Sequence, residues 1–182
     1  LEKGYEVHGI LKRNSVAENQ TARLDDVYST IKDNLYYADM TDMASLVRVL
    51  QEVEPDEIYN LAAQSHVRIS FDQPIYTAQT VAIGTMNLLE AIRLVCPKVK
   101  MYQASSSEMF GNSIDGDGYQ RETTPMNPTS PYGCSKVFGY NLVRNYRNSY
   151  DLFTCNGILF NHESPRRGTN FVTNKVVKEA VK

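Results

Sequence analysis

Tyr132 and Lys136 are the two residues of this sequence whose types and spacing point most directly to chemistry. Pro131 suits the first turn of a helix, and residues four apart on a helix lie one above the other on one face. An ammonium group stabilises a nearby phenolate and so lowers the pKa of a tyrosine from about 10 toward neutrality, which makes the phenol a general base for a hydroxyl group. The spacing by itself also fits an ordinary surface pair.

A serine run and a glutamate stand one crossover earlier, where Ser106 and Glu108 follow the strand expected at 99–104. The carboxyl ends of parallel strands converge, so this strand would deliver a hydroxyl and a carboxylate beside the Tyr132 helix. A carboxylate placed there could take a proton from the carbon next to a newly formed ketone, which indicates oxidation, elimination and re-reduction in one site. A flexible loop for the serines and a capping or exposed glutamate are the structural alternatives.

Apolar runs and helical periodicities alternate along the chain. Strands are expected at 5–11, 34–38, 57–62, 99–104 and 152–160, and helices between Asp42 and Pro55 and at 74–95, 132–150 and 170–182. The 74–95 helix should bury Val81, Leu88, Leu89 and Ile92. Strands separated by helices predict right-handed βαβ units, hence an α/β fold with a doubly wound, Rossmann-like parallel sheet covered on both faces. Ligands bind such sheets at the carboxyl ends of the strands.

The residues that follow the first predicted strand, which would be the second strand of a complete dinucleotide-binding fold, indicate which cofactor the protein binds. Lys12-Arg13-Asn14-Ser15 follows the strand expected at 5–11. A basic residue here accommodates the 2′-phosphate of NADP, whereas an acidic one would bind the ribose of NAD, so the sequence favours NADP over a merely solvated basic turn. Asp39 follows the next strand and could accept from the adenine amino group or serve as a turn residue.

Both ends of the sequence look like the interior of a longer protein. Leu1-Glu2-Lys3-Gly4 resembles the last turn of a helix with Gly4 as its C-cap, and the final helix has no cap. We therefore expect a fold truncated at both ends. Residues 1–160 would form an NADP-binding domain that lacks its first strand and glycine-rich loop, and residues 161–182 would begin a substrate-binding region.

Composition narrows the class of protein. A net charge of −2 gives no sign of a nucleic-acid or membrane-surface partner, and no apolar run is long enough to span a bilayer. Three widely spaced cysteines (Cys96, Cys134, Cys155) fit neither a disulfide framework nor a zinc site. The sequence therefore predicts a cytoplasmic protein without a metal site.

Several longer strings resemble the GDP-mannose 4,6-dehydratase family, a group of nucleotide-sugar dehydratases among the extended short-chain dehydrogenases/reductases. The resemblance covers all 182 residues. It rests on E-K-G-Y-E-V-H-G-I at 2–10, E-I-Y-N-L-A-A-Q-S-H-V at 57–67, S-F-D-Q-P-I-Y-T-A at 70–78, Y-Q-A-S-S-S-E-M-F-G at 102–111, S-P-Y-G-C-S-K at 130–136 and G-I-L-F-N-H-E-S-P-R-R-G-T-N-F-V-T at 157–173.

The resemblance implies conversion of GDP-mannose to GDP-4-keto-6-deoxymannose, with NADP as internal hydride carrier, in GDP-fucose biosynthesis. Tyr132 would take the 4-hydroxyl proton, Lys136 would hold the nicotinamide ribose, Glu108 would remove the carbon-5 proton, and Ser106 would hydrogen-bond the 4-oxygen. The implied cofactor contacts are Arg13, Asn14, Ser15, Asp39, Met40, Leu61, Ala62, Ala63, Gln64, Ser65, Tyr76, Tyr132, Lys136, His162 and Arg167. A homo-oligomer, either dimer or tetramer, is also implied.

Two departures and three alternatives accompany this resemblance. Ser106 stands where the family more often has threonine, and the loop at 112–119 is slightly longer than usual. A dTDP-glucose dehydratase usually pairs aspartate with glutamate where Ser107-Glu108 stand, and a UDP-sugar 4-epimerase needs no carbon-5 base. A non-catalytic nucleotide-binding relative has no need of all four catalytic residues. Arg166-Arg167 could bind the GDP diphosphate, reach a neighbour's cofactor or lie in an oligomer contact.

Overall fold

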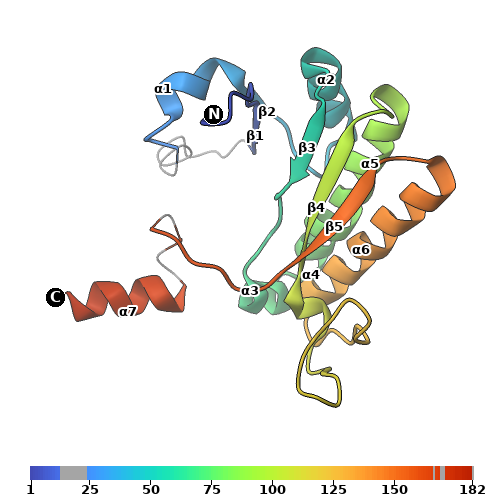
Figure 1. The fold of residues 1–182 in the computed structure, drawn as a ribbon. Helices are drawn as coiled ribbons and strands as arrows, with labels where there is room; N and C mark the ends of the chain where they lie inside the picture. The colour runs from blue at the N-terminus through green and yellow to red at the C-terminus, as the bar shows by residue number, and fades with distance from the viewer. Residues whose placement is uncertain (13–23, 166, 169–170, 182) are drawn as a thin grey trace.

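A computed structural model describes residues 1–12, 24–165, 167–168 and 171–181. Its strands are β1 (Gly9–Leu11), β2 (Leu35–Tyr37), β3 (Glu57–Asn60), β4 (Lys100–Ser106) and β5 (Thr154–Leu159). Its helices are α1 (Tyr28–Ile31), α2 (Met43–Val53), α3 (Val67–Asp72), α4 (Pro74–Thr77), α5 (Gly84–Val95), α6 (Pro131–Tyr150) and α7 (Val172–Ala180), with short turns η1 (Lys32–Asn34), η2 (Ala78–Ile83) and η3 (Ser107–Met109). Figure 1 shows their arrangement.

The strands are all parallel but form two sheets. One sheet pairs β1 with β2, and the other has the order β3-β4-β5. The predicted α/β class and parallel strand direction are confirmed, whereas the sheet is not continuous. In the doubly wound order 3-2-1-4-5-6, these groups match the flanks 3-2 and 4-5-6, and no described residue occupies the strand position between β1 and β3.

Helix α2 begins and ends where its sequence signals indicate. The Asp42 carboxylate caps it by accepting from the backbone N–H groups of Ala44 and Ser45, at 3.1 and 3.3 Å. Glu54 closes it in the left-handed conformation, with φ of 47°, just before Pro55. Leu46 and Leu50 of this helix are buried in the core together with side chains of α5, α6 and β4. The predicted cap is therefore confirmed.

The predicted helix at 74–95 is interrupted. Its four expected core residues (Val81, Leu88, Leu89 and Ile92) are all buried, as predicted. The chain nevertheless passes from α4 through a π-helical turn, η2, into α5. Helices α1 and α3 have no counterpart among the predicted elements. Both are only one or two turns long, and such short helices depend on tertiary packing rather than on periodicity.

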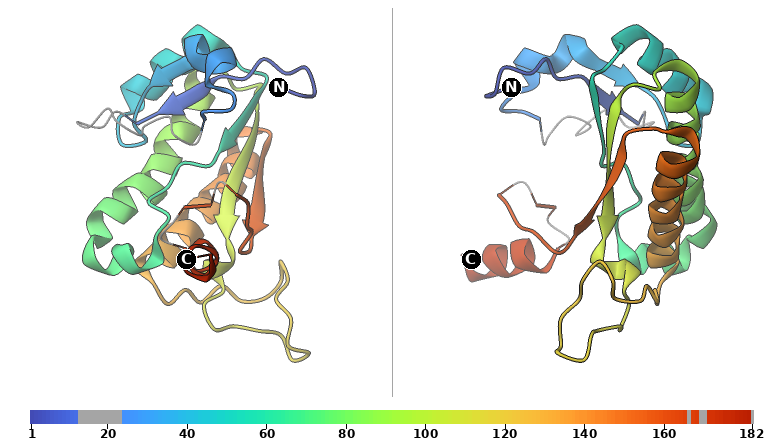
Figure 2. Two further views of the ribbon diagram at one scale, coloured as in Figure 1. Left: turned by 90° about the vertical axis from the view of Figure 1, so that its left-hand side faces the viewer. Right: turned by 45° about the vertical axis from the view of Figure 1, so that its right-hand side comes forward.

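The sheet β3-β4-β5 carries described helices on one face. Helices α5 and α6 lie behind β4 and β5 on the same side (Figure 2). Tyr59 and Tyr102 lie on the opposite face with their ring centroids 6.0 Å apart, and Tyr59 is 63% exposed. Among the described residues, helices therefore cover one face of this sheet. The carboxyl ends of the strands point toward α3, η3 and the start of α7, and this end of the sheet carries the residues of interest.

Candidate active site

The serine run is part of a strand rather than a flexible loop. Ser105 and Ser106 are the last two residues of β4, and the Ser105 hydroxyl donates to Asn156 Oδ1 on β5 at 3.0 Å. Ser106 caps η3, because its Oγ accepts from the backbone N–H of Glu108 at 3.2 Å. Serine is thus the capping residue, and the side chain of Glu108 is left without a capping role.

The start of α6 is held tightly against η3. Ser130 caps the helix by accepting from Gly133 N at 3.0 Å, and Pro131 occupies the first turn as predicted. A Cβ on Gly133 would lie 2.7 Å from the carbonyl oxygen of Glu108, so a larger residue at this position would push the two elements apart. The close approach places Tyr132 near Ser106 and Glu108, both of which influence the pKa of its phenol. The structure thus brings Ser106, Glu108 and Tyr132 together.

Lys136 joins the same cluster from the next turn of α6. Its side chain is 5% exposed, and Nζ donates to the carbonyl oxygen of Ala104 at 2.7 Å. Nζ lies 5.7 Å from the centroid of the Tyr132 ring. Burial of the ammonium lowers the pKa of Lys136 from 10.5 to about 8.

The expected low pKa of Tyr132 is not found in this structure. Burial is the largest influence and raises the pKa of the phenol, and the negative charge of Glu108 raises it further. The nearby Ser106 hydroxyl lowers it by less than burial raises it. Lys136 does not reverse the shift, because its ammonium donates to Ala104 rather than to the phenol. The prediction was wrong because i,i+4 spacing fixes a shared face and not the direction in which the lysine donates.

The buried ammonium should give the protein a characteristic dependence of stability on pH. Lys136 has a pKa of about 8 when folded and 10.5 when exposed, so the unfolded chain binds more protons between these values. The free energy of unfolding should therefore rise with pH over this window, by roughly 2–3 kcal/mol. Lys136→Met should remove the rise, and urea unfolding at pH 7 and at pH 10 measures it. The exposed Lys98 offers the control: Lys98→Met should keep the wild-type slope. Equal slopes in all three proteins would contradict the assignment.

A second group of predicted residues meets where β1 and β2 end. Lys12 Nζ lies 3.2 Å from Asp39 Oδ2 and donates to the Tyr76 hydroxyl at 3.0 Å. Asp39 Oδ1 accepts from the backbone N–H and the hydroxyl of Thr41, which fits the turn interpretation of this residue. These contacts lower the pKa of Asp39 although burial raises it. The predicted cofactor residues Arg13, Asn14 and Ser15 lie outside the described residues.

Met40 is positioned by α5. Its carbonyl oxygen accepts from Asn87 Nδ2 at 2.8 Å, and a Cβ on Gly84 would lie 2.7 Å from the Met40 Cβ. The loop after β2 is therefore packed against the start of α5, where the absence of a side chain on Gly84 allows the contact.

The loop after β3 is ordered by its own polar side chains. Gln64 donates to the His66 carbonyl and to Thr77 Oγ1, both at 3.1 Å, and accepts from His66 N at 2.6 Å. Leu61 is 68% exposed, Ala62 and Ser65 are exposed, and Ala63 is partly buried. The predicted cofactor residues from Leu61 to Ser65 thus form an accessible loop at the carboxyl edge of the sheet.

The segment after β5 is held mainly by contacts within itself. The guanidinium of Arg167 donates to the carbonyl oxygen of His162 at 2.8 Å and lies 3.9 Å above the ring of Phe171. Phe171 also contacts the ring of His66, with 6.2 Å between centroids. The segment therefore touches the loop after β3, and Arg167 also contacts Glu163 and Asn174 within the segment. Arg166 lies outside the described residues.

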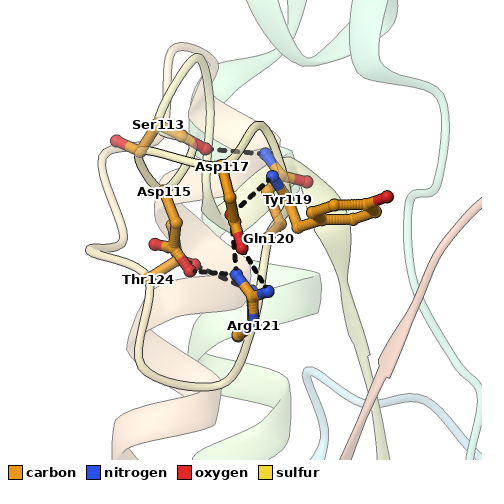
Figure 3. A network of polar contacts seen from close by, with 7 residues as sticks. All are labelled: Ser113, Asp115, Asp117, Tyr119, Gln120, Arg121 and Thr124. Carbon is orange, nitrogen blue, oxygen red and sulfur yellow. Dashed lines mark hydrogen bonds and ion pairs between the residues drawn. The ribbon is translucent and has the colours of Figure 1, made fainter.

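The predicted surface loop at 112–119 has an organisation that composition did not indicate. Arg121 donates to Asp115 at 2.9 Å and to Asp117 at 2.6 Å (Figure 3). Thr124 donates to the other oxygen of Asp115 at 2.8 Å. The Arg121 guanidinium lowers the pKa of Asp117. An arginine thus closes the loop that forms the rim beside η3.

Two buried amide residues near the site were not predicted from the sequence. Asn60 and Gln103 are buried between the strands, and Asn60 Nδ2 donates to Gln103 Oε1 at 2.8 Å. Gln103 could have indicated this pair. It lies two residues after Met101 on the same strand, so both side chains point to the same face, and Met101 is in the core.

No described helix is both long and apolar enough to cross a bilayer. The described parts of the chain also hold no group of three or more His, Cys, Asp or Glu side chains arranged to bind a metal ion.

Comparisons with known proteins agree with the fold and the motifs. GDP-mannose 4,6-dehydratase from Vibrio cholerae serotype O1 is 52% identical over 185 residues, covering 98% of this chain and 48% of that protein. The Homo sapiens protein of the same name is 50% identical over 190 residues, covering 100% and 50%. The chain thus spans about half the length of the curated relatives it matches.

A solved structure and a family description complete the comparison. The dTDP-glucose 4,6-dehydratase DesIV from Streptomyces venezuelae, crystallised with NAD and TYD, superposes with a TM-score of 0.80 at 26% identity, covering 96% of this chain and 52% of that one. The family described as GDP-mannose 4,6 dehydratase matches residues 1–182. This chain belongs to the GDP-mannose 4,6-dehydratase family.

Proposed function

We propose that this chain carries the catalytic residues of an NADP-dependent enzyme, a carbon–oxygen lyase, that converts GDP-mannose to GDP-4-keto-6-deoxymannose. The observation that carries the proposal is the meeting of Ser106, Glu108, Tyr132 and Lys136 at the end of β4. The names of relatives about 50% identical to this chain support GDP-mannose as the substrate. A 4-epimerase of the same fold has no use for the carboxylate of Glu108 beside the tyrosine.

Each of the four side chains has a distinct task in this proposal. Tyr132 takes the proton of the sugar 4-hydroxyl, and the nearby Ser106 donates to the 4-oxygen. Glu108 takes the carbon-5 proton, which the 4-ketone makes acidic, and passes it to the departing 6-hydroxyl, so that water leaves carbon 6. Carbon 5 regains a proton from solvent when carbon 6 receives the hydride. Burial raises the pKa of Tyr132, so Lys136 has the task of supplying the positive charge that favours the phenolate in the loaded site.

The residues at the carboxyl edge fit a nicotinamide dinucleotide. The cofactor, when bound, supplies the hydride acceptor for carbon 4 and the hydride donor for carbon 6. DesIV was crystallised with NAD, which supports a nicotinamide cofactor in this fold. Lys12, followed by Arg13, supports NADP in particular, because a cation at this strand exit suits a 2′-phosphate. The exposed loop from Leu61 to Ser65 and Lys136 would hold the cofactor further along the edge.

The wider organisation is also part of the proposal. Residues 1–160 form the cofactor-binding part, because they contain the five described strands and the loops that follow β1 to β4. Residues 161–182 contribute to the substrate-binding region. We further propose a cytoplasmic homo-oligomer that serves GDP-fucose synthesis, as the family resemblance implies.

A Glu108→Gln variant of the full-length enzyme tests the dehydratase role. We expect turnover of GDP-mannose to fall about 100-fold, because the amide cannot accept the carbon-5 proton. Oxidation at carbon 4 should persist, since Tyr132 and Lys136 are unchanged. Single-turnover absorbance of NADPH measures the oxidation, and deuterium incorporation at carbon 5 in D₂O measures the proton transfer.

The exposed Glu122 provides a matched control on the neighbouring loop. Glu122→Gln should retain both oxidation and deuterium incorporation. Normal turnover by Glu108→Gln would exclude the carbon-5 role and would favour an epimerase-like reaction, whereas loss of oxidation as well would show that Glu108 acts earlier than we propose.

A further inference from the structure

Two buried amide side chains face each other across β3 and β4. Asn60 and Gln103 are register partners in the parallel ladder and are 4% and 2% exposed. Asn60 Nδ2 donates to Gln103 Oε1 at 2.8 Å. The pair lies one residue before the loop that begins at Leu61 and one residue before Ala104.

The other polar atom of each amide makes a hydrogen bond to a different part of the site. Asn60 Oδ1 accepts from the backbone N–H of Ala62 at 3.2 Å, in the loop after β3. Gln103 Nε2 donates to the carbonyl oxygen of Ala104 at 3.4 Å. The same oxygen accepts from Lys136 Nζ at 2.7 Å. An unbroken run of hydrogen bonds therefore connects the loop after β3 with the lysine on α6.

The direction of every bond in this run is fixed. An amide offers donors on its nitrogen and an acceptor on its oxygen, so a flip of either Asn60 or Gln103 would oppose like atoms. Fully satisfied buried networks of this kind hold one geometry. Stability alone does not require them, because a pair of apolar residues with the same shapes can be nearly as stable.

We propose that Asn60 and Gln103 are positioning residues that hold the loop after β3 and the Lys136 ammonium in register along one bound cofactor. This inference rests on the proposed function, since both ends of the run must face the same dinucleotide. Neither amide touches the substrate or the cofactor in this proposal; each acts through Ala62 or Lys136.

The test uses the full-length protein and three variants: Gln103→Met, Asn60→Leu and the double variant. Each single change leaves one buried amide unsatisfied and should lower the melting temperature. The double change removes both polar groups together and should restore most of that loss. The dissociation constant of NADPH should nevertheless rise about tenfold, and kcat should fall about tenfold, in all three variants, because misplaced groups at a site lose rate even when the fold is intact.

A purely structural role makes the opposite prediction for the double variant. Recovery of NADPH affinity and kcat together with the melting temperature would overturn the proposal. Ser105→Ala is the matched control, because it also breaks a hydrogen bond between neighbouring strands, the partly buried bond from Ser105 on β4 to Asn156 on β5. It should lower the melting temperature and leave NADPH affinity unchanged.

The same experiment separates this inference from the proposed function. NADPH affinity is measured without any sugar nucleotide, by fluorescence titration. If the wild-type protein binds NADPH but does not turn over GDP-mannose, the proposed function fails, and the comparison of affinities still decides the role of the amide pair.

Discussion

Tyr132→Phe should lower kcat for GDP-mannose by about 10³–10⁴-fold in the full-length enzyme. The substitution removes only the hydroxyl, which is the group that we assign as general base and whose loss has effects of this size. The ring is 8% exposed, and phenylalanine would keep it in the same buried position. Loss of the hydroxyl alone, with the ring retained, should change the melting temperature little. Steady-state rates and a thermal melt measure the two quantities.

Tyr140 provides the control on the same helix. Its ring lies on the outer part of α6, where the Arg144 guanidinium is 5.8 Å from the ring centroid. Tyr140→Phe should retain wild-type kcat. A Tyr132→Phe enzyme with more than a tenth of wild-type kcat would rule out Tyr132 as the base.

Gly111→Ala should destabilise the protein by about 2–6 kcal/mol. Gly111 has a φ of +56°, and a Cβ there would lie 2.0 Å from the carbonyl oxygen of Asn127. An unfavourable backbone conformation and an overpacked contact each cost about 1–3 kcal/mol, and the obstacle here is backbone that cannot rotate away. Gly111 N also donates to the Glu108 carbonyl at 3.3 Å, so relaxation of the clash would move η3.

Gly116 is the matched position for this prediction. It lies in the same loop, and a Cβ there would meet nothing within 4 Å. Gly116→Ala should therefore unfold at the same urea concentration as the wild type. If Gly111→Ala also unfolds at the wild-type midpoint, the close approach between η3 and Asn127 does not determine stability.

The parts that could be predicted from the sequence depend on local spacing. Asp42 as a cap, Pro131 at the start of α6 and the shared face of Tyr132 and Lys136 all follow from residues within one or two turns. Convergence of strand ends then predicted that Ser106 and Glu108 would reach Tyr132, and the structure brings them together.

The parts that could not be predicted depend on burial and on partners distant in the chain. The pKa of Tyr132 is raised because its surroundings exclude water, and the strand pattern does not report this. Lys136 donates to Ala104, 32 residues away, and Asn60 reaches Gln103 over 43 residues.

The number of residues in the π-helical turn η2 is constrained, unlike the number in a surface loop. On its N-terminal side, the Thr77 hydroxyl accepts a hydrogen bond from Gln64 in the loop after β3. On its C-terminal side, Met40 of the loop after β2 packs against Gly84, where a side chain would leave no room for it. Deleting one residue between 78 and 83 would restore regular α-helical bonding but would rotate one end against the other by about 100°. Either the contact between Gln64 and Thr77 or the contact between Met40 and Gly84 would then be lost. Natural insertions and deletions should therefore accumulate at 112–119 and be excluded from η2.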